Sequence, residues 1–105
     1  MSGVGAAGLE RVSLSDLDAS GRAQLFEGEP KTVRLTLSAG EEVPPHQHPG
    51  RDIVFHLLDG EVDLTLGETT LSLSASDVAR FDGEQDISPA AVTDCEALLV
   101  LATSE

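Results

Sequence analysis

The sequence consists of short apolar stretches that turn-forming residues interrupt about every six to ten positions, a spacing typical of all-β domains. The stretch 32–38 is the clearest: Val33, Leu35 and Leu37 alternate with polar residues. A period of two is that of a strand with one buried face. Asp59-Gly60 is a strong hairpin turn signal between two further stretches of this kind. No stretch has the period of an amphipathic helix, so the sequence predicts a β-sandwich or a small barrel.

The apolar stretches give an expected order of strands along a single domain. Residues 1–8 are rich in glycine and alanine and are expected to form a flexible tail. Residues 9–105 are enough for one compact core. Ser88-Pro89 is interpreted as part of a connection. The expected strands are 22–27, 32–38, 53–58, 62–66, 69–74, 78–81 and 96–102, with an extended segment at 43–48 and a short strand followed by a turn at 9–17.

The chain is strongly acidic, with 19 Asp and Glu against six Lys and Arg and a formal net charge of −13. This charge disfavours binding to nucleic acid or to an anionic membrane. Dispersed acids and a single lysine fit adaptation to high salt, and the alternative is an acidic surface that docks a basic protein.

No apolar run approaches the ~20 residues of a membrane span and the N-terminus is not a convincing signal peptide, so a cytoplasmic location is expected. Cys95 is the only cysteine and is predicted to lie in a turn as a bystander thiol.

All three histidines lie within the stretch from Gly40 to Gly60. His46 and His48 are two positions apart, so in an extended segment both imidazoles project from the same face. That arrangement suits a metal ion or a polar ligand.

The spacing of this stretch resembles the first motif of the cupin family. The family motif is a Gly, five residues, His-any-His, three or four residues, Glu, six residues and Gly. Gly40, His46, His48 and Gly60 fit it, whereas Ile53 occupies the Glu position. The resemblance implies an antiparallel jelly-roll barrel. It also implies, in the family, a divalent transition metal such as iron, zinc, manganese or nickel.

The second family motif normally supplies one more histidine to that metal. Residues 75–84 resemble the opening of this motif, but its histidine would fall near Asp86 or Ile87. By this resemblance the chain keeps His46 and His48 and lacks two of the four ligands.

Two registers of the following strand are possible, and the family spacing and an apolar barrel lining favour the first. In the first, Ile53, Phe55 and Leu57 point inward and line an apolar ligand pocket. In the second, Asp52 takes the place of the missing acid and His56 also points inward. A slip by one residue turns every side chain over, so only one register can hold. Asp52, His56 and Glu42 are therefore additional candidate metal ligands.

The sequence favours a small cupin barrel that binds a small molecule, with a divalent metal on the His46 and His48 pair as an open question. One alternative is a metal-dependent oxygenase or isomerase that acts on a small polar substrate. The other is an acidic protein-interaction module.

Arg51 or Arg80 could hold a carboxylate if either pointed into the barrel, and a surface ion pair is the simpler expectation. A homodimer is expected, because the stretch 53–58 is apolar on both faces and needs cover.

Overall fold

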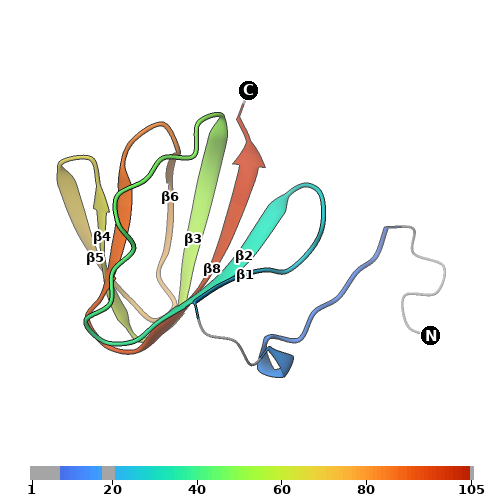
Figure 1. Cartoon of the computed structure of the whole chain (residues 1–105), viewed down its shortest axis with the longest axis horizontal. Coiled ribbons are helices and arrows are strands. Elements are labelled where there is room, and N and C mark those ends of the chain that lie inside the picture. The colour runs from blue at the N-terminus through green and yellow to red at the C-terminus, as the bar shows by residue number, and fades with distance from the viewer. Residues whose placement is uncertain (1–7, 18–20, 105) are drawn as a thin grey trace.

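The computed structural model describes residues 8–17 and 21–104, and within them eight antiparallel strands form two sheets (Figure 1). One sheet has the order β1-β2-β8-β3-β6 and the other β5-β4-β7. The predicted all-β barrel is thereby confirmed. The elements are a 3-10 turn at Leu14–Asp16 and the strands β1 Gly21–Gln24, β2 Lys31–Leu37, β3 Arg51–Asp59, β4 Glu61–Leu66, β5 Thr69–Ser74, β6 Val78–Asp82, β7 Ile87–Ala91 and β8 Cys95–Thr103.

The core lies between the two sheets, and β3 is central to it. Ile53, Phe55 and Leu57 are at most 1% exposed, whereas Asp52 is exposed and His56 is half-buried on the opposite face. The pairing of β3 with β8 is irregular between Leu57 and Asp59. Because this irregularity follows the three inward-facing residues in the chain, it does not change the face on which they lie. The chain therefore has the first of the two registers.

β7 is a strand that the sequence analysis interpreted as a connection. Pro89 lies in its middle, opposite Leu64 of β4. The Pro89 carbonyl oxygen accepts a hydrogen bond from the Val43 backbone N–H at 2.9 Å, so the proline nitrogen faces the segment 40–48 and not β4. A missing N–H on that side costs the β4–β7 ladder nothing, which explains why a proline is tolerated here.

The segment 40–48 runs antiparallel to β7 without forming a regular strand. Backbone hydrogen bonds link Gly40 to Ala91, Val43 to Pro89 and His46 to Ile87, the last pair in both directions. Pro44 and Pro45 lack the N–H groups that a continuous ladder would need. These bonds fix the path of the chain from which His46 and His48 project.

Two glycines lie where the backbone of another segment leaves no space for a side chain. A Cβ on Gly60, whose φ is +85°, would lie 2.2 Å from the Asp94 carbonyl oxygen. A Cβ on Gly83 would lie 2.3 Å from the His48 carbonyl oxygen. Gly83 lies in the turn after β6, and its lack of a side chain leaves space for the histidine segment.

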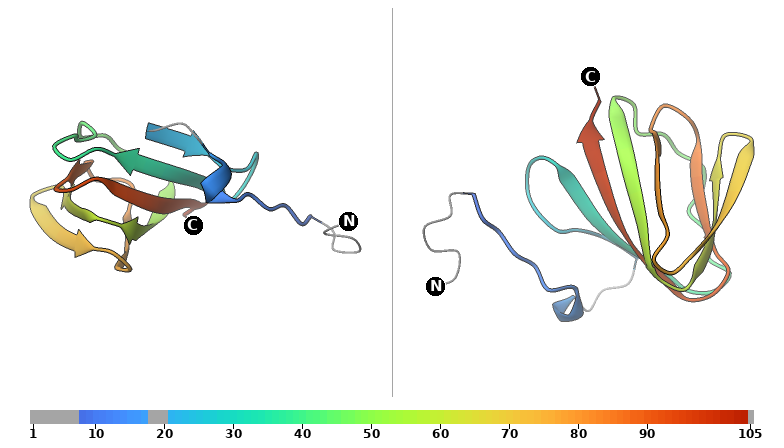
Figure 2. Two further views of the ribbon diagram at one scale, coloured as in Figure 1. Left: turned by 90° about the horizontal axis from the view of Figure 1, so that it is seen from below. Right: turned by 180° about the vertical axis from the view of Figure 1, so that it is seen from behind.

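The predictions for the N-terminal part and for Cys95 need correction. Residues 9–17 contain the 3-10 turn and no strand, and residues 1–7 of the expected tail lie outside the described part of the chain. Leu9 to Val12 has no strand partner in either sheet, and the views in Figure 2 show this segment extending away from both sheets.

Cys95 is buried at the start of β8, and this burial raises the pKa of its thiol. In residues 8–17 and 21–104 there is no helix long and apolar enough to cross a membrane.

Candidate ligand cavity

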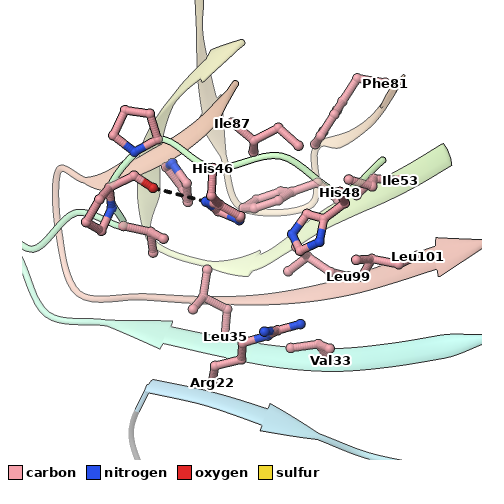
Figure 3. A pocket seen from close by; sticks show the side chains of 15 residues that line it. Arg22, Val33, Leu35, His46, His48, Ile53, Phe81, Ile87, Leu99 and Leu101 are labelled. Atoms are coloured by element: carbon pink, nitrogen blue, oxygen red, sulfur yellow. Dashed lines mark hydrogen bonds between the residues drawn. The ribbon is translucent and has the colours of Figure 1, made fainter. Parts of the chain in front are cut away.

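A cavity of about 350 Å³ opens between the two sheets, bounded by β1, β2 and β8 on one side and by the segment 43–48 on the other (Figure 3). Of its fifteen lining residues, three are polar and the other twelve are apolar. This volume is at the lower end of the range for small-molecule sites. The polar residues are Arg22, His46 and His48, and the apolar ones are Val33, Leu35, Val43, Pro44, Pro45, Ile53, Phe55, Phe81, Ile87, Pro89, Leu99 and Leu101.

The two histidines stand side by side at the cavity, with ring centroids 4.7 Å apart and ring planes nearly perpendicular. His46 Nδ1 lies 3.0 Å from the Pro44 carbonyl oxygen. A carbonyl oxygen only accepts, so Nδ1 carries a proton and, in the neutral ring, Nε2 keeps a free lone pair. The same-face arrangement expected from the spacing is the one observed.

The electrostatic surroundings of His48 are positive. Partial burial lowers the pKa of the His48 imidazole, and His46 and Arg22 lower it further by repelling its protonated form. A neutral His48 ring has one N–H donor and one acceptor nitrogen available to a ligand.

Arg22 is the third polar group, and it comes from the edge strand β1. Its partner across the β1–β2 ladder is Leu35, which also lines the cavity. Figure 3 shows the guanidinium directed inward over Val33 and Leu35, opposite His48. Arg22 was not among the predicted site residues. A four-residue edge strand is too short for its sequence to fix which side chains face inward.

The other predicted site residues are dispersed. Ile53 and Phe55 line the cavity, while Leu57 is fully buried but lies outside the lining. Asp52 and His56 occupy the opposite face of β3. Glu42 is exposed and bridges to Ala90 of β7.

The arginines singled out from the sequence also lie elsewhere. Arg51 forms an ion pair with Glu29, which holds the pKa of the Glu29 carboxyl below its usual value. Arg80 pairs with Val54 on the outer face of β6 and is exposed. Neither arginine reaches the cavity.

The donor set does not fit the four-ligand metal centre that the cupin resemblance implies. Ile53 stands at the position of the acid, and its side chain is a buried hydrocarbon. The family resemblance places the missing histidine near Asp86 or Ile87, and Ile87 lines the cavity with an apolar side chain. Among the described residues there is no group of three or more His, Cys, Asp or Glu side chains that could hold a metal ion.

Comparisons with known proteins agree with this architecture. No curated protein sequence matches the chain. Among solved structures, the cupin domain of Cnp3 from Schizosaccharomyces pombe has a TM-score of 0.80 at 21% identity, covering 88% of this chain and 72% of that one.

Two other solved structures are similar to the chain over most of its length. A predicted oxalate decarboxylase from Thermotoga maritima has a TM-score of 0.71 at 26% identity, covering 78% of each chain. KdgF from a Halomonas species has a TM-score of 0.70 at 17% identity, covering 80% of each chain. Residues 33–101 match the cupin domain family. The chain therefore belongs to the cupin family.

Proposed function

We propose that this protein is a small-molecule-binding cupin whose cavity takes a ligand with a largely apolar body. The observation that carries the proposal is the lining itself: twelve apolar side chains surround about 350 Å³, with three polar ones at the histidine and β1 walls. A preformed apolar cavity with a few convergent polar groups is the common form of a small-molecule site.

The apolar lining also argues against one activity suggested by a structural neighbour. Oxalate, after which the predicted decarboxylase from Thermotoga maritima is named, is a compact and strongly hydrated dianion. Placing it against Ile53, Phe55 and Leu101 would remove its water without returning hydrogen bonds, which is costly. An apolar ligand loses no such hydration.

A metal-dependent activity has less support from the residues present. His46 and His48 supply two imidazoles, whereas non-haem iron sites need two histidines and a carboxylate, and zinc sites have three or four protein ligands. The apolar cavity, and not a metal centre, therefore carries the proposed function.

The experiment is a titration with 1-hexanol, followed by NMR of the methyl groups of Ile, Leu and Val. We expect saturable shifts for Ile53 and Leu101, which line the cavity. Hydrophobic transfer and the small size of the probe predict a Kd of about 1 mM.

A cavity-filling variant and a matched surface variant complete the test. Val43→Phe adds bulk inside the cavity from a half-buried position, and we expect it to weaken hexanol binding at least about tenfold. Val78→Phe makes the same change at a side chain that is 60% exposed, and binding should stay unchanged. Shifts that do not saturate, or that survive Val43→Phe, would refute the proposed function.

A further inference from the structure

The distribution of charge in the cavity is the reverse of that in the whole chain. The chain has 19 acidic and six basic residues, yet the lining contains an arginine, two histidines and no carboxylate. A ligand inside this cavity therefore meets an arginine and two histidines and no acidic side chain.

Arg22 differs from two other arginines in its lack of an acidic partner. Arg34 forms an ion pair with Glu96 at 3.2 Å, and Arg51 forms one with Glu29. Within residues 8–17 and 21–104, Arg22 has no ion pair. Arg22 is exposed to solvent and lines the cavity.

The direction of the Arg22 side chain is the second observation. An unpaired surface arginine usually extends into solvent, but here the guanidinium lies over Val33 and Leu35 on the cavity wall (Figure 3). A guanidinium presents a planar fork of N–H donors that matches the two oxygens of a carboxylate. On the opposite wall, the His48 imidazole also lines the cavity.

The apolar part of the cavity wall determines which kind of ligand body can bind. Ile53, Phe55, Phe81 and Leu101 form the wall beyond the three polar groups. A hydrocarbon chain or an aromatic ring gains free energy by leaving water for this wall, while a second charged group would find no partner there.

We infer that the natural ligand is a small monocarboxylate with an apolar body, its carboxylate held by Arg22 and its body packed against Ile53, Phe55 and Leu101. The inference rests on the proposed function and specifies its ligand class. Arg22 is then the residue that selects for the anionic group.

The test compares hexanoate with 1-hexanol, which share the hydrocarbon chain and differ in charge, by the same methyl NMR titration. We expect wild-type protein to prefer hexanoate by roughly tenfold, the usual effect of a hydrogen bond to a charged group. Arg22→Gln should abolish this preference, and Arg22→Lys should retain part of it.

Arg80→Gln is the matched control, because it removes the same charge from the outer face of β6 and should leave both affinities unchanged. Thermal melting checks that each variant is folded. Equal affinity for the two probes, or a preference for hexanoate that persists in Arg22→Gln, would overturn the inference while hexanol binding still supports the proposed function. If neither probe binds the folded wild-type protein, both proposals fail.

Discussion

Gly83→Ala is expected to destabilise the protein through one backbone contact that also positions the cavity histidines. Gly83 is buried at the end of the β6 strand, next to the segment that carries His48. The added methyl group would lie 2.3 Å from the His48 carbonyl oxygen and 2.9 Å from the Arg51 carbonyl oxygen. Both neighbours are backbone atoms, so the segment 48–51 must move as a unit.

The size of the effect follows from the contacts that such a movement disturbs. Overpacking of a well-packed site costs about 1–3 kcal/mol. The His48 N–H donates to the Gly83 carbonyl oxygen at 2.8 Å, and the Gly83 N–H donates to the Arg51 carbonyl oxygen at 2.8 Å. Weakening one of these bonds adds about 1 kcal/mol. The sum, about 2–4 kcal/mol, is a large part of the roughly 5–15 kcal/mol that stabilises a typical domain.

Urea denaturation followed by circular dichroism measures this difference in the free energy of unfolding. Gly28→Ala is the control, because Gly28 has a φ of +82° and open space around its Cβ position. Its substitution costs only the left-handed conformation, about 1 kcal/mol. If Gly83→Ala lowers the free energy of unfolding no more than Gly28→Ala does, Gly83 and the backbone of the histidine segment are not in close contact. In that event the reasoning is refuted.

Four further predictions concern metal, pH, salt and assembly. Protein purified without added metal is expected to hold far less than one equivalent of iron, zinc, manganese or nickel, because two imidazoles are an incomplete donor set. Elemental analysis showing near-stoichiometric metal that is lost in a His46→Ala/His48→Ala double variant would contradict this. The pKa of His48 is lowered in the folded protein, so the unfolded chain binds a proton more readily. The contribution of His48 to the free energy of unfolding is therefore present above the ordinary histidine pKa, and it is lost as the pH falls through the lowered value. His48→Gln should flatten this part of the pH dependence in urea denaturation, and an unchanged profile would exclude His48 as its source. The urea midpoint should rise from dilute buffer to molar salt as screening reduces the repulsion among 19 acids, whereas full stability in dilute buffer would instead favour a dedicated acidic docking surface. Light scattering at high salt should give the mass of a dimer, because Val54 and Val100 are apolar neighbours on the outer face of the larger sheet. Val100→Glu should give a monomer. A monomeric mass for the wild-type protein would rule out the dimer.

Much of the fold could be predicted from the sequence, because strand periodicity and turn chemistry are local signals. Val33 and Leu35 alternate with polar residues, and both are buried in β2. The spacing from Gly40 to Gly60 also favoured the register in which Ile53 and Phe55 face inward. These features depend on neighbours in the sequence, so they can be read without knowledge of distant contacts.

The parts that could not be predicted depend on contacts between segments far apart in the chain. β7 was interpreted as a connection because Pro89 breaks most ladders, and only its pairing with the irregular segment 40–48 makes the proline acceptable. Arg34 was expected on a half-exposed polar face, but it is 4% exposed and bonded to Glu96 of β8. Arg22 reaches the cavity through pairing with Leu35, which its own short stretch does not encode.

The position of Arg22 on an edge strand separates ligand choice from the integrity of the fold. β1 has a single partner strand, β2, and Arg22 is exposed there, whereas the apolar cavity wall is shared with the buried core. A change at this one position can alter the charge of the preferred ligand while the packing of Ile53, Phe55 and Leu101 stays intact. During evolution, a barrel built in this way can acquire a new ligand class by a single substitution, without first passing through an unstable intermediate.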